Sequence, residues 1–216
     1  MKAFIFDMDG TLIDNMAVHH KAWQTTLSEL GMPLTLEEVK LKCHGKNEEI
    51  LEKLFPNKYS EEQLQEISLS KELIYQKQYI NDLKPIDGLM AFLDDAKAKN
   101  IPLGIGTAAP ETNVNFVLNN LPIRHYFDSV IHSGMVSKGK PDPEVFQKVA
   151  DELGYDLAEC IVFEDSPTGA QTSQNAGCKS VILTTTHSED EFDKYHNIKM
   201  IAKDYTGLVV SEIQNL

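Results

Sequence analysis

The chain has 216 residues, of which 42% are hydrophobic and 25% are charged, as in ordinary globular proteins. The net charge of −13 implies an acidic surface that repels nucleic-acid phosphates and anionic lipids, so neither is expected as a partner. Three cysteines without a CxxC spacing argue against a disulfide framework or a zinc site. The N-terminal residues do not resemble a signal peptide, and no apolar stretch approaches a membrane span. We therefore expect a soluble, cytoplasmic protein.

The N-terminal third of the chain begins with a short strand-like run and continues with a long segment of helix-forming residues. KAFIF (residues 2–6) is a short apolar run that predicts a buried strand, and the polar segment DMDGT follows it. Residues 15–82 are rich in Leu, Glu, Lys and Gln and predict helices. Ser60 followed by Gln63 has the pattern of a capping box at the start of the last of these helices. We interpret residues 15–82 as an all-helical insert.

From residue 85 onward, predicted strands alternate with predicted helices. The strand-like runs are IPLGIGT, SVIHS, CIVFED, KSVILTTT and IKMIAKD. Alternation of this kind predicts a parallel sheet covered by helices on both faces. We therefore predict an α/β core made of residues 1–14 and 83–216, split by the helical insert. The last residues, GLVVSEIQNL, suit either a closing helix packed on the core or an exposed contact.

Polar residues follow four of the predicted strands, at the edge where parallel sheets bind their ligands. They are Asp7 and Asp9, then Thr107, then Lys138 and Lys140, and finally Glu164 and Asp165. Carboxylates crowded at one edge repel each other, so the acids predict a bound cation. Oxygen ligands of this kind favour Mg²⁺. The alternative is that each acid caps a helix or is simply solvated.

The residue types at this edge suit phosphoryl transfer. An aspartate such as Asp7 can attack phosphorus, and a second carboxylate two residues later, Asp9, can protonate the leaving oxygen and then activate water. The Thr107 hydroxyl can bind a phosphate oxygen, or it can cap the following helix. Lys140 can neutralise the phosphate, with Lys138 as the nearby competitor.

Four segments together resemble the motifs of the haloacid dehalogenase superfamily in order and spacing. They are FDMDGTLIDN, the strand end at Thr107, GKPDPEVF and VFEDSPTGAQTSQNAG. The resemblance runs from Ile5 to about Gly177 and is greatest to the β-phosphoglucomutase-like and phosphoglycolate phosphatase-like branch. It implies a Rossmann-like parallel-sheet core with a small helical cap domain, residues 15–82, inserted after the first strand. It also implies Mg²⁺ as cofactor, a small phosphorylated metabolite as partner, and a monomer.

The resemblance implies a catalytic and metal-binding role for four acids. Asp7 would be the nucleophile and a Mg²⁺ ligand, and Asp9 the general acid and base that binds Mg²⁺ through its carbonyl. Asp165 would complete the Mg²⁺ site, and Glu164 would either bind the ion directly or contact a group that does. An aspartate at position 9 resembles the phosphatases and mutases, whereas the dehalogenases lack this second acid.

The remaining implied roles concern phosphate and substrate. Thr107, Ala108 and Lys140 would hold the transferring phosphoryl group. In the cap, His19 and Lys71 match substrate-side positions of the family. From the residues alone, His19 could instead be solvated and Lys71 could be an ordinary charge on a helix surface.

One departure from the family pattern bears on the reaction. From Gly45 the sequence reads GKNEEI, and Glu48 stands where the mutases carry an arginine for a second phosphate. Lys46 could substitute for that arginine, but a point charge on a flexible side chain binds a phosphate less well. The leading hypothesis is therefore a Mg²⁺-dependent phosphatase of small phosphate monoesters, sugar phosphates above all, acting through an aspartyl-phosphate. The alternatives are a β-phosphoglucomutase-like isomerase and an inorganic pyrophosphatase. A non-enzymatic binding module ranks last, because both Asp7 and Asp9 are present.

Overall fold

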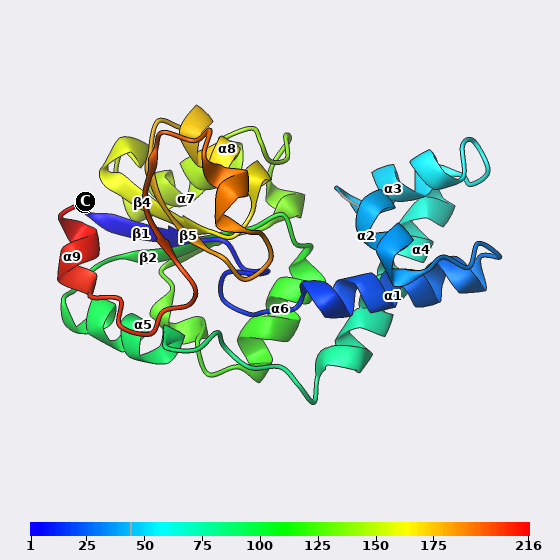
Figure 1. Cartoon of the computed structure of the whole chain (residues 1–216), viewed down its shortest axis with the longest axis horizontal. Helices are drawn as coiled ribbons and strands as arrows, with labels where there is room; N and C mark the ends of the chain where they lie inside the picture. The colour runs from blue at the N-terminus through cyan, green and yellow to red at the C-terminus, as the bar shows by residue number, and fades with distance from the viewer. Residues whose placement is uncertain (44) are drawn as a thin grey trace. The chain divides into compact units, whose positions relative to one another are not determined.

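A computed structural model describes residues 1–43 and 45–216. The chain divides into two compact units (Figure 1). One unit comprises Met1–Asp14 with Lys84–Leu216 and is called the core here, and the other comprises Asn15–Leu83 and is called the cap. The chain thus leaves the core directly after the loop that follows the first strand and returns to it at residue 84.

The core contains a six-stranded sheet in the order β3-β2-β1-β4-β5-β6, with every neighbouring pair parallel. The strands are β1 (Ala3–Phe6), β2 (Leu103–Gly106), β3 (Ser129–Ile131), β4 (Cys160–Glu164), β5 (Lys179–Leu183) and β6 (Ile198–Ala202). The predicted α/β class with a parallel sheet is confirmed. The strand order changes direction between β1 and β4, and in open α/β sheets such a switch point is where ligands bind.

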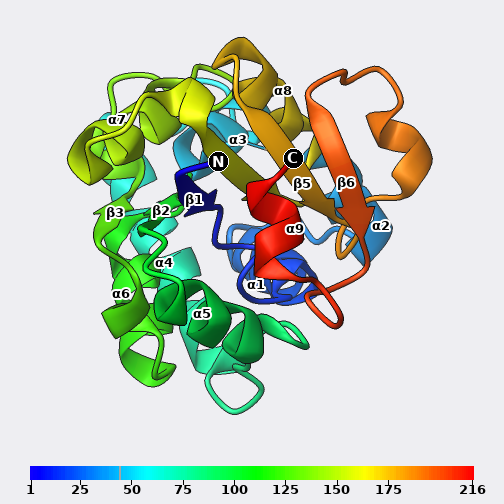
Figure 2. The same ribbon diagram turned by 90° about the vertical axis from the view of Figure 1, so that its left-hand side faces the viewer.

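Helices cover both faces of the sheet (Figure 2). They are α5 (Leu89–Ala98), α6 (Glu111–Asn120), α7 (Glu144–Leu153), α8 (Pro167–Asn175) and α9 (Val210–Gln214). Helix α7 packs on β1, β2 and β3, and α8 packs on β4 and β5, while α5 and α9 contact each other on the other side. Short 3₁₀ turns lie at Arg124–Tyr126, Ser133–Met135, Leu157–Glu159 and Glu189–Phe192.

The alternation of side chains along β1 builds a separate apolar layer on each face of the sheet. Phe4 and Phe6 point to one face, where both rings pack against Phe163 of β4 at 5.6 and 4.6 Å between centroids. Ala3 and Ile5 point to the other face and join the cluster that contains Phe146 of α7. Every residue of β1 is fully buried. A strand buried on both faces is rigid, so the loop that follows it starts from a fixed position.

The cap is all helical, as the sequence predicts. Its helices are α1 (Met16–Glu29), α2 (Leu36–Lys42), α3 (Asn47–Leu54) and α4 (Glu61–Tyr79). They enclose a small apolar cluster that includes Trp23, Leu27 and Leu51. The predicted capping box at the start of α4 is confirmed, with Gln63 N donating to Ser60 Oγ at 3.3 Å and Ser60 N donating to Gln63 Oε1 at 2.9 Å.

The C-terminal segment, left open by the sequence, is a closing helix. Val210 and Ile213 of α9 are fully buried, and α9 packs against α5. The Met1 ammonium donates to the Gln214 carbonyl, which ties the two ends of the chain to each other.

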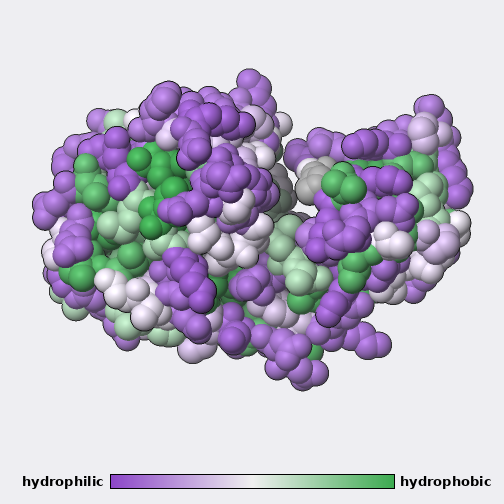
Figure 3. All heavy atoms as spheres, viewed as in Figure 1, coloured by the Kyte–Doolittle hydropathy of each residue, from purple (hydrophilic) through white to green (hydrophobic). Residues whose placement is uncertain are grey.

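Hydrophilic residues cover most of the surface seen in Figure 3. No helix of the described residues is both long and apolar enough to cross a membrane.

Candidate active site

The loop after β1 is wound into a tight turn that presents Asp7. The Met8 carbonyl accepts the backbone N–H groups of Thr11, Leu12 and Ile13 at 3.3, 2.8 and 3.3 Å. Gly10 closes the turn with a φ of +76°, a conformation that side-chain-bearing residues rarely adopt. Asp7 itself donates its backbone N–H to Phe163 O of β4 at 2.9 Å. This bond holds Asp7 beside the end of the neighbouring strand, at the switch point.

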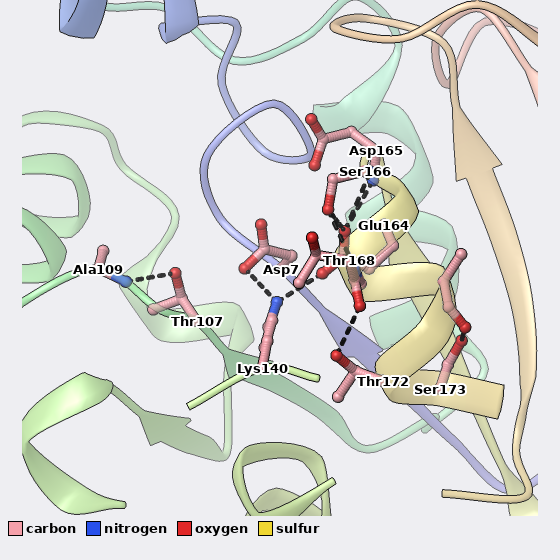
Figure 4. A network of polar contacts seen from close by, with 12 residues as sticks. Asp7, Thr107, Ala109, Lys140, Glu164, Asp165, Ser166, Thr168, Thr172 and Ser173 are labelled. Carbon is pink, nitrogen blue, oxygen red and sulfur yellow. Dashed lines mark hydrogen bonds and ion pairs between the residues drawn. The ribbon is translucent and has the colours of Figure 1, made fainter. Parts of the chain in front are cut away.

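The end of β4 places Glu164 and Asp165 opposite Asp7 (Figure 4). Glu164 is fully buried, and its Oε2 accepts the backbone N–H groups of Asp165 and Ser166 at 3.0 and 3.2 Å. The Ser166 hydroxyl donates to the same oxygen at 3.1 Å. A Cβ at Gly169, in the first turn of α8, would lie 1.7 Å from the Glu164 Cδ atom, so only glycine leaves room for this carboxylate.

Lys140 joins the two strand ends. Its Nζ lies 2.8 Å from Asp7 Oδ1 and 2.5 Å from Glu164 Oε1 (Figure 4), and its side chain is 8% exposed. Lys138, the competitor that the sequence left open, is 73% exposed and lies 3.6 Å from Asp142. The structure therefore places Lys140, and not Lys138, among the carboxylates.

The residues present fit a divalent cation. Asp7, Glu164 and Asp165, called the acidic cluster here, each offer a carboxylate oxygen, and the three oxygens lie within 4.8 Å of one another. All three residues are buried, and Lys140 supplies one positive charge against three negative ones. The missing charge equals that of one divalent cation, and the all-oxygen donor set suits Mg²⁺.

The raised pKa values of two acids in the acidic cluster indicate that their ionised forms are unfavourable without a cation. Burial raises the pKa of Asp7 from 3.8 to about 7, while the Lys140 charge lowers it and the charges of Glu164 and Asp9 raise it. Burial, followed by the Glu164 and Asp7 charges, raises the pKa of Asp165 well above its usual value. Burial opposes the charge on Lys140, but the adjacent Asp7 and Glu164 carboxylates raise its pKa overall. A bound cation would stabilise the ionised carboxylates.

The phosphate-binding candidates after β2 differ in their surroundings. Thr107 is 1% exposed, and its backbone N–H donates to Ile131 O at 3.0 Å. Its hydroxyl oxygen accepts the Ala109 N–H at 3.1 Å (Figure 4). The alternative that Thr107 caps the next helix is wrong, because the N-cap position of α6 is Pro110. Ala108, the next residue in the same turn, is exposed.

His19 and Lys71 meet inside the cap. Lys71 is 2% exposed, and its Nζ lies 2.9 Å from His19 Nδ1 and 3.0 Å from Glu72 Oε1. Asn47 Nδ2 donates to the same Glu72 oxygen at 2.7 Å. Burial, with a contribution from Lys71, lowers the pKa of His19 well below 6.5. The alternatives of a solvated histidine and a surface lysine charge are therefore wrong.

Three residues that support this edge of the sheet were not identified from the sequence. Glu144 begins α7, and Thr185 and Thr186 follow β5. Each makes hydrogen bonds to a loop that carries a candidate site residue. The weak signals for them were a second acid after GKPDP and a run of three threonines after a predicted strand.

Glu144 closes the loop that carries Lys140. Its carboxylate accepts the Ser137 hydroxyl at 2.6 Å, the Ser137 N–H at 3.0 Å and the Lys138 N–H at 2.8 Å. The Ser137 hydroxyl and backbone bonds, together with Lys148, hold the pKa of Glu144 well below its usual value. The loop is therefore fastened to the first turn of α7 two residues before Lys140.

We expect Glu144→Gln to lower kcat roughly 10-fold, because a neutral amide loses the charge-assisted bonds that hold the Lys140 loop. Steady-state kinetics on any active substrate measures the loss. Glu159→Gln is the matched control, since Glu159 pairs with Lys2 on another part of the core. In a Lys140→Met background the Glu144 substitution should have no further effect. An equal loss in that background would show that Glu144 does not act through Lys140.

The match to known proteins is extensive. The sequence pattern of haloacid dehalogenase-like hydrolases matches residues 4–183, most of the chain. The chain belongs to this family. The family resemblance drawn from the four motifs is thereby confirmed, and so is the expectation that the protein is an enzyme of a hydrolase family.

Individual relatives of this haloacid dehalogenase-like hydrolase include phosphatases and a mutase. A phosphorylated carbohydrates phosphatase of Thermotoga maritima is 28% identical over 84% of this chain and 84% of its own. A β-phosphoglucomutase of Bacillus subtilis is 30% identical over 84% of this chain and 82% of its own. The solved structure of an Entamoeba histolytica hydrolase of this family superposes with a TM-score of 0.92 at 26% identity, covering 100% of this chain and 98% of that one.

Proposed function

We propose that the protein is a Mg²⁺-dependent phosphatase that hydrolyses small phosphate monoesters, principally sugar phosphates, through an aspartyl-phosphate. The observation that carries the proposal is the position of Asp7 at the switch point, with Lys140 Nζ 2.8 Å from its carboxylate and two further buried acids beside it. A carboxylate next to a fixed cation and a candidate metal site is suited to attack a phosphoryl group.

The chain's own residues divide the reaction into two steps. Asp7 attacks phosphorus, the ester P–O bond breaks, and Asp9 donates a proton to the leaving alcohol. Asp9 then takes a proton from water, which attacks the same phosphorus and releases Asp7 as a carboxylate. Lys140 and Thr107 stabilise the charge on the phosphoryl oxygens. A bound Mg²⁺ would be held by the acidic cluster and would neutralise charge on the phosphoryl group.

The proposed substrate class rests on the relatives and on the cap. The Thermotoga maritima relative is named for phosphorylated carbohydrates. We propose that His19 and Lys71 bind the sugar part of the substrate. These residues suit a molecule rich in hydroxyl groups, because the lysine ammonium donates hydrogen bonds and a neutral imidazole has one donor and one acceptor.

A sugar-phosphate mutase is the second candidate, because the Bacillus subtilis β-phosphoglucomutase is 30% identical to this chain. A mutase of this kind must bind a bisphosphate intermediate and therefore needs a cation for the second phosphate. The first turn of α3 instead carries Glu48 and Glu49. Lys46, the N-cap residue of α3, is a less effective phosphate ligand than an arginine, and the two acids beside it would repel a phosphate, so this segment favours hydrolysis. Inorganic pyrophosphate remains a further candidate substrate.

The proposal is tested by phosphate release from a panel of sugar phosphates, other monoesters and pyrophosphate, with Mg²⁺ and with EDTA. We expect sugar phosphates to give the highest kcat/KM and EDTA to abolish release. β-Glucose 1-phosphate is followed in parallel for the appearance of glucose 6-phosphate. Conversion without phosphate release would favour the mutase, and fastest release from pyrophosphate would favour a pyrophosphatase. No reaction with any compound would overturn the enzymatic proposal.

A further inference from the structure

The loop after β5 contacts both loops that carry the candidate catalytic acids. It contains two adjacent threonines, Thr185 and Thr186, and both are half-buried. The Thr185 hydroxyl donates to the Gly10 carbonyl at 2.5 Å, in the turn after β1. The Thr186 hydroxyl contacts Asp165 at the end of β4. One dipeptide thus hydrogen-bonds to the two strand ends that flank the switch point.

Thr186 acts directly on the Asp165 side chain. Its Oγ1 contacts the carboxylate oxygen Oδ2 and lies 3.2 Å from the Asp165 carbonyl oxygen. The carboxylate is the stronger acceptor because it is charged. A bond to one carboxylate oxygen restricts rotation of the group and so fixes the position of the other oxygen. Asp165 is only 4% exposed, so water has little access to replace the hydroxyl.

Thr185 acts on the same carboxylate indirectly, through Gly10. It holds the carbonyl of Gly10, and the Cα of Gly10 lies against Asp165 so closely that an added Cβ would be 2.1 Å from Oδ2. The Asp165 Oδ2 atom therefore lies close to both the glycine and the Thr186 hydroxyl. The two threonines thus hydrogen-bond to the two groups nearest this oxygen, the Gly10 backbone and the Asp165 carboxylate itself.

We propose that Thr186 is a positioning residue for the cation site, and that Thr185 supports it by holding Gly10 against Asp165. The pair would set the affinity of the acidic cluster for a divalent cation by preorganising one of its carboxylates. Removing a hydrogen-bond partner of a metal-ligating group typically weakens metal binding about 10–100-fold. The inference rests on the Mg²⁺ dependence in the proposed function.

The test measures Mg²⁺ binding by isothermal titration calorimetry, without substrate or turnover. We expect Thr186→Val, which keeps the shape but removes the hydroxyl, to weaken Mg²⁺ binding about 10–100-fold. Thr186→Ser, which keeps the hydroxyl, should bind within about 3-fold of wild type on the same grounds. Thr184→Val is the matched control, because Thr184 bonds to Ala202 of β6 and touches no acid of the cluster in the described contacts.

The outcomes separate this inference from the proposed function. Wild-type protein that binds no Mg²⁺ would overturn the cofactor proposal and the inference with it. Wild-type binding that Thr186→Val leaves unchanged would overturn the inference alone. Equal weakening in Thr186→Val and Thr186→Ser would also overturn it, because packing rather than the hydroxyl would then be responsible. Melting temperatures in EDTA check that each variant is folded, and Thr186→Ala replaces the valine variant if that one is not.

Discussion

Phosphate release should fall by at least about 10³-fold in the Asp7→Asn variant, because an amide cannot attack phosphorus and form the acyl phosphate. The substitution preserves the shape of the side chain, and Lys140 keeps its second partner, Glu164. The loss should therefore appear in kcat, with little change in the binding of substrate. Phosphate release under saturating substrate and Mg²⁺ is the measurement.

Stability is the internal control for this variant. Burial raises the pKa of Asp7 to about 7, so the ionised carboxylate is destabilising at higher pH in the absence of a cation. Asparagine removes that charge, and the melting temperature of Asp7→Asn in EDTA at pH 8 should equal or exceed that of wild type. A large fall in melting temperature would mean that lost activity reports lost structure rather than a lost nucleophile.

A chemical trap makes the assignment of Asp7 direct. Hydroxylamine attacks the carbonyl of an acyl phosphate, releases phosphate and leaves a hydroxamate on the carboxyl carbon. Wild-type protein quenched during turnover should carry the hydroxamate at Asp7, located by peptide mass spectrometry, and Asp7→Asn should carry none. A hydroxamate on another acid, or full activity in Asp7→Asn, would contradict the proposed mechanism.

Gly10→Ala should be nearly as damaging, although it adds only one methyl group and removes no candidate catalytic side chain. The added Cβ would lie 2.1 Å from Asp165 Oδ2, a separation that no side chain tolerates. Either the carboxylate or the turn after β1 must move, and a displacement of about 1 Å can reduce catalysis about 100-fold. We expect activity to fall at least about 100-fold and Mg²⁺ binding to weaken with it.

Gly154→Ala is the matched control for this prediction. Gly154 follows α7 with a φ of +79°, close to the +76° of Gly10, but nothing lies within 4 Å of its added Cβ. Both variants therefore bear the same backbone strain of about 1 kcal/mol, and they differ in the collision with Asp165 alone. Activity that falls equally in the two variants would show that backbone strain, and not the position of Asp165, is responsible.

The order of the motifs and the periodicity along the chain were sufficient to predict the fold class. Alternating apolar runs and helices after residue 85 predicted the parallel sheet, because strands buried on both faces have no polar alternation. The helical composition of residues 15–82 predicted the insert. The capping box at Ser60 was visible because its two residues lie three positions apart and interact locally. Such features depend on neighbours in the sequence.

The sequence left several questions about the site that the structure answers. It favoured Lys140 and ranked Lys138 second, but it could not show which of the two lysines reaches Asp7. Only the path of the loop, fastened by Glu144, directs Lys140 to Asp7 and leaves Lys138 exposed. For His19 and Lys71 the sequence left a substrate-side role and a helix-surface position open, and only the packing of α1 on α4 shows that the two side chains meet.

The amino-acid sequence by itself thus determined the class of fold, the family and the acids that follow β1 and β4. The tertiary structure alone decided which side chains support those acids. Thr186 is 21 residues from Asp165, and Thr185 is 175 residues from Gly10, so no local pattern links either pair. The strand order places β5 beside β4 and β4 beside β1, and this brings the three loops together at one edge of the sheet. Hydrogen bonds between loops depend on that order, which hydrophobic periodicity does not encode.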